Sequence, residues 1–161
     1  MENRNTLNKL NRTPFLQFQS LFSTLKAIEG GTLNGSYRAS FTGPGWLRAI
    51  APRSLSLLHF KGWCGKRFEH GGEKGINLLM RGTLIEKYPF HTSLQASLLD
   101  GQTSLAVHYD AGSPFPWGYV IDELRRLDET FILGMTMVKQ RGLAKIAFPF
   151  LLYPWEDDHG V

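Results

Sequence analysis

Cysteine is nearly absent from this sequence, because Cys64 is the single one in the chain. A lone cysteine cannot form a disulfide within the chain, so the fold does not depend on an oxidising compartment. Long apolar runs are also missing, and none approaches the ~20 residues that cross a bilayer. The first residues, Met-Glu-Asn-Arg-Asn, lack the apolar stretch of a signal peptide. We therefore expect a cytoplasmic protein with no transmembrane segment.

Positive charge is not concentrated anywhere in the sequence. The formal net charge is +4, and the basic pairs Lys66–Arg67 and Arg125–Arg126 have acidic neighbours. Proteins that bind nucleic acids usually carry a basic stripe or patch. We therefore predict no nucleic-acid partner, while an anionic small molecule stays open as a ligand.

Signature motifs of catalysis and metal binding are missing as well. The sequence has no P-loop, no dinucleotide-binding glycine pattern, no zincin helix and no G-x-S-x-G elbow. Its five histidines are far apart and lack the spacing of zinc ligands. We predict no metal and no cofactor, with haem held by one histidine as the alternative. For Cys64 we expect a small buried apolar side chain rather than a nucleophile.

Aromatic residues are plentiful, with 11 Phe, 5 Tyr and 4 Trp among 161 residues. Such side chains suit strands and apolar pockets alike. A chain of this length fits one domain, because two domains would each have a thin core. We expect a disordered tail over residues 1–12, a single barrel domain over 13–153 and an acidic tail over 154–161.

An amphipathic helix is expected over residues 14–29. Thr13 can cap this helix, and Pro14 fits its first turn, where a backbone N–H would have no partner. Apolar side chains recur at helical spacing, at Phe15, Phe18, Phe22, Leu25 and Ile28. Gly30 and Gly31 end the pattern. We expect the helix to pack against the rest of the domain, with a membrane-surface or partner-docking helix as the alternative.

Short strands separated by turns account for most of the remaining chain. They are expected at residues 33–42, 76–80, 83–88, 94–98, 104–109, 131–138 and 144–152, and residues 55–60 and 62–69 form either two strands or one long bent strand. The clearest hairpin turns at Asp100–Gly101, a dipeptide typical of tight turns. Arg81–Gly82 and Arg141–Gly142 are further expected turns.

A second helix is indicated by the spacing of Val120, Ile121, Leu124 and Leu127. About eight short strands joined by tight turns favour a meandering antiparallel barrel over a parallel sheet. We therefore predict a mainly β fold: an antiparallel lipocalin-like β-barrel of about eight strands. It has an N-terminal helix and a second helix before the last two strands. A barrel of eight strands is filled by side chains or holds one small ligand.

The stretch 61–68, Lys-Gly-Trp-Cys-Gly-Lys-Arg-Phe, is the most distinctive in the chain. Two glycines bracket Trp63, which indicates a bend or a close approach of another segment. One interpretation is a barrel corner. The other makes Trp63 and Phe68 pocket walls, with Lys66 or Arg67 at the rim to meet an anionic head group.

A second distinctive stretch, residues 122–128, is rich in charge. The first interpretation is a solvated helix face. In the second, Arg125 points into a pocket with Asp122 and Tyr119 as its partners. A carboxylate, an arginine and a tyrosine beside an apolar pocket could perform acid–base chemistry.

These two stretches resemble bacterial proteins of the GXWXG and allied domain families of unknown function. The first motif matches at Trp63-x-Gly65-Lys66, although its leading glycine stands at position 62 and Lys61 occupies the expected place. The second matches over residues 128–134, Asp-x-x-x-Ile-Leu-Gly. The segment Leu33-x-Gly35-x-Tyr37 is similar to the opening of lipocalin-like barrels. The resemblance covers residues 33–152 and implies a calycin-like barrel with no established reaction.

Three functions follow as hypotheses. The first is binding of a hydrophobic or amphipathic small molecule, such as a lipid, fatty acyl or polyketide-like compound, inside the barrel. The expected ligand-binding residues are Tyr37, Trp63, Lys66, Phe68, Tyr109, Tyr119 and Arg125. The second is an isomerase, cyclase or hydrolase in the same cavity, with candidate catalytic residues Asp122, Arg125, His108 and Tyr109. The third is a structural or partner-docking protein, and a homodimer is compatible with all three.

Overall fold

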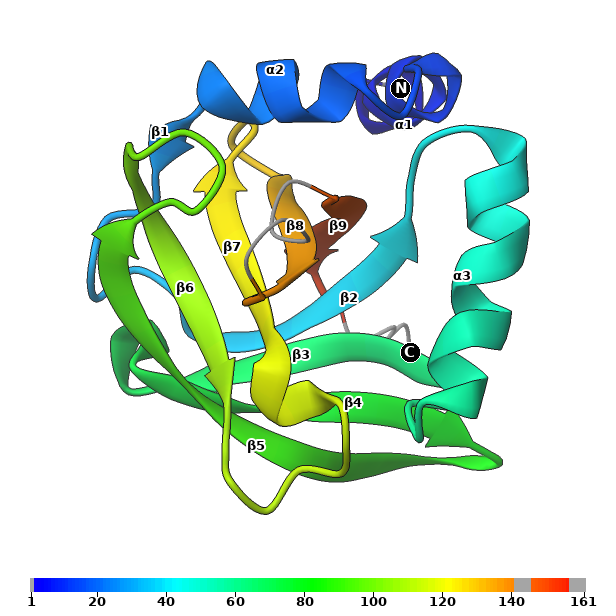
Figure 1. Cartoon of the computed structure of the whole chain (residues 1–161), viewed down its shortest axis with the longest axis vertical. Helices are drawn as coiled ribbons and strands as arrows, with labels where there is room; N and C mark the ends of the chain where they lie inside the picture. The colour runs from blue at the N-terminus through cyan, green and yellow to red at the C-terminus, as the bar shows by residue number, and fades with distance from the viewer. Residues whose placement is uncertain (1, 141–145, 157–161) are drawn as a thin grey trace.

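The fold is a closed antiparallel barrel of eight strands, β2 to β9 (Figure 1). The computed structural model describes residues 2–140 and 146–156. The strands are β2 (Gly35–Phe41), β3 (Trp63–Glu69), β4 (Lys74–Arg81), β5 (Thr83–Ala96), β6 (Thr103–Tyr109), β7 (Val120–Arg126), β8 (Ile132–Val138) and β9 (Phe148–Pro154). Each strand pairs with the next in the chain, and β9 pairs with β2 to close the ring. The predicted barrel is therefore confirmed.

One short strand lies outside the ring. β1 (Lys26–Ala27) pairs with β7, with Lys26 opposite Arg126 and Ala27 opposite Arg125. Two single-turn helices, η1 (His70–Gly72) and η2 (Trp117–Tyr119), lie between strands. The expected hairpin at Asp100–Gly101 connects β5 to β6, and Gly82 connects β4 to β5.

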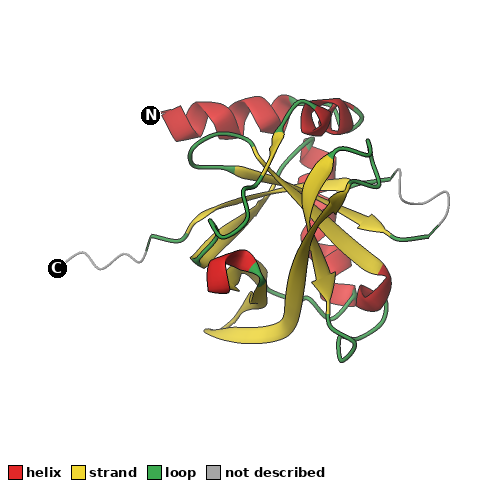
Figure 2. Ribbon diagram, turned by 90° about the vertical axis from the view of Figure 1, so that its left-hand side faces the viewer, coloured by secondary structure: helices red, strands yellow, loops and turns green. Residues whose placement is uncertain are grey.

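Two N-terminal helices, α1 (Glu2–Arg12) and α2 (Gln17–Ser23), lie together on one side of the barrel (Figure 2). Leu10, Phe18 and Phe22 pack there on the outward side chains of β7 and β8, such as Ile121 and Leu133. Residues 1–12 were expected to be a loose tail, but Leu10 is buried and the segment from Glu2 is helical. The apolar face of α2 is thus covered by the chain itself.

The predicted helix over 14–29 is wrong in its extent. α2 ends at Ser23, and the chain then extends into β1. Ile28, which the helical spacing assigned to the same face as Phe18 and Phe22, instead lies inside the barrel. Apolar residues at helical spacing can therefore continue beyond the end of a helix, into a segment whose apolar side chains are buried against the sheet instead.

The predicted second helix over residues 120–127 is also wrong, because this segment is strand β7. Val120 and Leu124 point into the barrel, while Ile121 and Arg125 point outward under α2 and the β5–β6 loop. Both faces of the strand are buried, so its sequence lacks the alternation of a half-buried strand.

The third helix, α3 (Gly45–Leu57), connects β2 to β3 in the chain and stands at the side of the barrel (Figure 1). The sequence pattern predicted a short helical or irregular element over 46–50, ended by Pro52, and a strand at 55–60; the helix instead continues through Pro52 to Leu57. Pro52 lies inside the helix, and Leu47 is its one buried residue. This helix therefore rests on the barrel mouth rather than in a packed core.

The expected strand at 144–152 corresponds to β9, which begins at Phe148. The expected turn at Arg141–Gly142 and the end of the acidic tail, from residue 157, lie outside the described residues. No helix in the described part of the chain is long and apolar enough to cross a membrane.

Gly134 on β8 gives a first prediction about stability. A Cβ atom added there would lie 2.2 Å from the ring of Phe150, which stands opposite this glycine on the neighbouring strand β9. We expect Gly134→Ala to lower the free energy of unfolding by about 1–3 kcal/mol, the usual cost of overpacking a core. Urea unfolding measures it, with Gly112→Ala as the control, because a Cβ at Gly112 meets nothing within 4 Å. Equal stability of the two variants would contradict this packing.

Candidate functional site

The barrel interior consists of two halves. Three residues of β7 point into the barrel. Val120 and Asp122 line an open cavity, and Leu124 belongs to a packed cluster. On β6, Tyr109 lines the cavity and Val107 belongs to the packed cluster. We call the packed part the closed half; its residues are Ile28, Leu33, Phe68, Phe90, Leu105, Val107, Leu124, Ile132, Phe150 and Leu152.

The other half is hollow, with a cavity of about 240 Å³. Aromatic side chains form much of its wall, including Trp63 of β3 and Trp117 of η2. The inner side of α3 contributes Leu47, Ile50 and Leu55. A cavity with a mainly apolar wall and few polar groups is the usual form of a small-molecule site.

Three polar side chains lie where the hollow half meets the closed half, and we call them the floor: Tyr109, Asp122 and Thr136. Asp122 accepts two hydrogen bonds there, from the Tyr109 hydroxyl at 2.7 Å and from the Thr136 hydroxyl at 2.7 Å. Thr136 stands opposite Asp122 in the β7–β8 ladder. The strand pairing itself thus places these groups together.

Lys66 lies directly behind the floor and is fully buried. Its ammonium group is 3.1 Å from Asp122 Oδ2 and donates to Tyr109 Oη at 3.0 Å and to Asn77 Oδ1 at 2.9 Å. The three hydrogens of the ammonium are therefore matched by three acceptors. The rings of Phe90 and Tyr109 lie 4.9 Å from Nζ, which favours the cation further.

Asn77 supports this arrangement from β4. Its Oδ1 also accepts the indole N–H of Trp63 at 3.1 Å, and its amide donates to the Tyr88 carbonyl at 2.8 Å. The amide orientation is thus fixed by partners on both sides, so Trp63 and Lys66 are held in place by one side chain.

Burial governs the acid–base behaviour of the site. It lowers the pKa of Lys66, and the neighbouring Asp122 carboxylate opposes that shift. The pKa of Tyr109 is raised well above its ordinary value, first by burial and then by the charge of Asp122. Tyr109 is therefore a neutral donor across the physiological range.

Four of the residues singled out from the sequence converge at this site: Trp63, Lys66, Tyr109 and Asp122. Lys66 was expected at the rim, where it would meet an anionic head group. Instead it lies behind the floor and is paired with Asp122. Arg67 points outward and pairs with Glu69 and Glu86.

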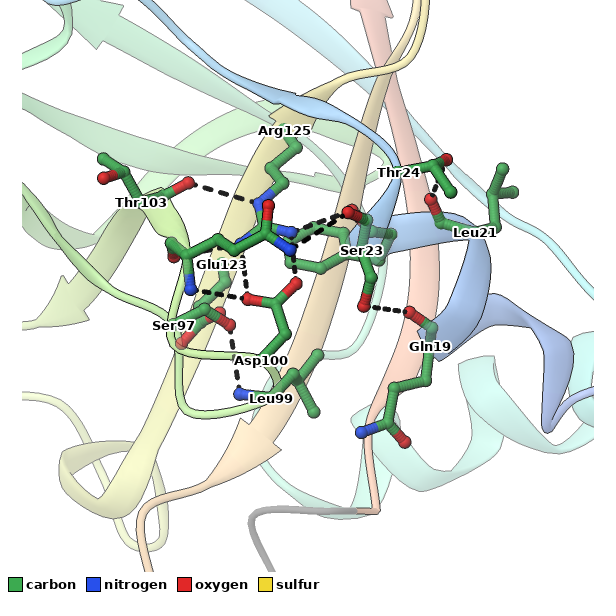
Figure 3. A network of polar contacts seen from close by, with 12 residues as sticks. Gln19, Leu21, Ser23, Thr24, Ser97, Leu99, Asp100, Thr103, Glu123 and Arg125 are labelled. Atoms are coloured by element: carbon green, nitrogen blue, oxygen red, sulfur yellow. Dashed lines mark hydrogen bonds and ion pairs between the residues drawn. The ribbon is translucent and has the colours of Figure 1, made fainter.

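Arg125 does not reach the cavity, so its predicted partners Asp122 and Tyr119 are wrong. It points outward from β7 and pairs with Asp100 of the β5–β6 loop at 2.6 and 2.7 Å (Figure 3). It also donates to the Phe22 carbonyl at the end of α2 at 2.9 Å. Arg125 thus joins the N-terminal helix to the hairpin loop.

The remaining candidates lie away from the floor. His108 is on the outer face of β6, bonded to Ser93 and stacked on His91. Tyr119 is 62 % exposed in η2. Tyr37 and Phe68 pack edge to face at the closed half. None of these side chains is within the set that lines the cavity in the described residues.

The sequence interpretation missed Asn77, Thr136 and the cavity wall supplied by α3. Asn77 stands within an apolar run, Ile-Asn-Leu-Leu-Met. A polar residue inside a buried strand needs a partner, and this was the available signal. Cys64 is half-buried and donates weakly to the Leu78 carbonyl at 3.4 Å. Among the described side chains, no group of three His, Cys, Asp or Glu residues is placed to hold a metal ion.

Comparison with known proteins shows the fold and no more. No protein-family model matches the chain, and no curated protein matches its sequence. A solved structure, the crystal structure of a protein from Thermomonospora curvata, is similar with a TM-score of 0.68 and 16 % sequence identity. The match covers 97 % of this chain and 100 % of that one. The eight-stranded barrel with its helices is therefore an architecture that this chain shares with an experimental structure.

Proposed function

We propose that the protein binds one apolar small molecule in the hollow half of its barrel. The observation that carries this proposal is the cavity of about 240 Å³, with three polar side chains at its floor and a mainly apolar wall in which Thr42 and Ser54 are the other hydroxyl groups. A barrel of eight strands can be filled by its own side chains, as the closed half is. The hollow half is instead left open, and an open apolar cavity of this kind is typical of a small-molecule binding site.

The cavity volume sets the size of the ligand. An apolar cavity of ~150 Å³ takes up benzene. By proportion, a cavity of about 240 Å³ holds roughly ten non-hydrogen atoms. This is the size of butylbenzene or a monoterpene, and smaller than a long fatty acyl chain.

Calorimetric titration with butylbenzene tests the proposal. We expect one binding site with a dissociation constant between about 1 μM and 1 mM, the range for a ligand of this size without a strong polar anchor. Trp63 and Trp117 line the cavity, so their fluorescence should change along the same binding curve.

A cavity-filling variant provides the matched comparison. Val120 lines the cavity and is buried, so Val120→Phe should fill part of the space and abolish the binding heat. Leu84 is 47 % exposed outside the cavity, so Leu84→Phe should bind like the parent protein. Both variants must keep the parent's thermal transition. Unchanged binding by a folded Val120→Phe protein would refute a ligand site in the barrel.

An enzyme acting on an apolar substrate is the second candidate. The buried groups Lys66 and Tyr109 beside the Asp122 carboxylate favour it, because burial lowers the pKa of Lys66 and raises that of Tyr109, and titratable groups with shifted pKa beside a pocket often mark active sites. An isomerase or cyclase of this kind would remove a proton from carbon. Incubation with apolar ketones in D2O, followed by proton NMR, would then show loss of C–H signals that Asp122→Asn abolishes.

A further inference from the structure

We infer that the ligand is a neutral molecule with one hydroxyl group, a small apolar alcohol or phenol, and that it donates this hydroxyl to Asp122 or Thr136. This inference rests on the proposed function and specifies its ligand chemistry. It follows from which donors and acceptors the floor has left free.

The donors at the floor are all in use. The hydroxyls of Tyr109 and Thr136 both donate to Asp122, and the three hydrogens of the Lys66 ammonium have three acceptors. The indole N–H groups of Trp63 and Trp117 donate to Asn77 and to the Leu58 carbonyl. Within the described residues, the floor therefore offers no free hydrogen to a ligand carbonyl or carboxylate.

Acceptors are available at the same place. Asp122 Oδ1 accepts only the Thr136 hydroxyl among the described groups, although a carboxylate oxygen can accept two hydrogen bonds. Thr136 Oγ1 donates and keeps its own lone pairs. Both residues line the cavity, so a ligand hydroxyl at the floor finds a charged or neutral acceptor.

The charge balance at the floor disfavours an ionic ligand. The positive charge of Lys66 and the negative charge of Asp122 cancel at 3.1 Å. A ligand carboxylate would stand beside Asp122 without a donor, and a ligand ammonium would share Asp122 with Lys66. An ion in an apolar cavity without its own partner is strongly disfavoured. A neutral hydroxyl keeps every group paired.

Four ligands of ten non-hydrogen atoms each separate these possibilities: 4-propylphenol, the isomeric methyl ether 4-ethylanisole, butylbenzene and 4-methylbenzoate. The ether keeps the oxygen and loses the donor. In calorimetric titrations we expect the phenol to bind about tenfold or more tightly than the ether, as hydrogen bonds to charged groups imply. Butylbenzene should resemble the ether, and the benzoate should bind most weakly.

The paired replacement Lys66→Met with Asp122→Leu supplies a second test, because an apolar pair of similar volume is often tolerated in place of a buried ion pair. In this variant the charged acceptor is gone and only the neutral Thr136 hydroxyl remains, so the phenol's advantage over the ether should shrink, while butylbenzene still binds. If the variant does not fold, the four titrations of the parent protein decide. Equal binding of phenol and ether, or tightest binding of the benzoate, overturns the hydroxyl inference and leaves the apolar site standing. Absence of binding by all four overturns the proposed function itself.

Discussion

Lys66→Met should destabilise the protein by about 3–5 kcal/mol, the cost of removing one partner from a buried ion pair. The variant leaves Asp122, which is 2 % exposed, without its cation. It also removes a donor from Asn77 and from Tyr109. Methionine fills a similar volume, so the loss comes from the uncompensated carboxylate rather than from an empty space. Urea unfolding followed by circular dichroism measures it.

The double variant Lys66→Met with Asp122→Leu is the control for this prediction. It removes both charges, so its stability should return to within about 2 kcal/mol of the parent, as buried pairs replaced by apolar residues often do. A thermodynamic cycle with the single variants gives the coupling energy. If the double variant is as unstable as the sum of the singles, Lys66 and Asp122 do not stabilise each other.

Arg125→Met should cost about 2–4 kcal/mol, because several buried polar groups lose one shared partner. Arg125 is fully buried and joins the Asp100 carboxylate to carbonyls of Phe22, Gln102 and Thr103. We expect the contact of α2 with the barrel to weaken first. Hydrogen exchange should therefore accelerate at Phe18 and Phe22 more than in β3 and β4. Uniform acceleration would contradict the role assigned to Arg125.

Acid titration separates the charge of Arg125 from its packing. The pKa of Asp100 is lowered from 3.8 to about 2, chiefly by the hydrogen bonds from Arg125 and to a smaller extent by the backbone N–H of Gln102. Because the folded pKa lies below the unfolded one, this stabilisation is present above about pH 4 and is lost as the pH falls towards 2. The stability difference between parent and Arg125→Met should therefore shrink over that interval. A constant difference would place the effect in packing alone.

The barrel could be predicted because its strands are short and its turns carry clear signals. The Asp100–Gly101 hairpin and the turn at Gly82 are local features, and each appears where the sequence indicates it. Trp63 and Lys66 could be selected because they lie in the stretch 61–68, where two glycines bracket the tryptophan, and Asp122 because it lies in the charged stretch 122–128. Their convergence with Tyr109 depends on the register of β3, β6 and β7 around a closed ring.

The errors at β7 and α3 have two physical sources, and the first is burial on both faces of an element. β7 is buried inside by the barrel and outside by α2, so Val120, Ile121 and Leu124 imitate a helical spacing. Arg125 was therefore assigned to a pocket that it faces away from. α3 has the opposite problem, because Leu47 is its one buried residue and its inner side meets a cavity. Because the inner side of α3 faces a cavity rather than packed side chains, its sequence shows little periodic repetition of apolar residues.

A crystal structure of the protein grown with 4-propylphenol tests the central claim most directly. We expect density for one molecule in the hollow half, with its ring between Trp63 and α3 and its hydroxyl within hydrogen-bond distance of Asp122 or Thr136. The Lys66–Asp122 pair should remain in place. A cavity closed by its own side chains, or a ligand whose hydroxyl points away from the floor, would contradict the account.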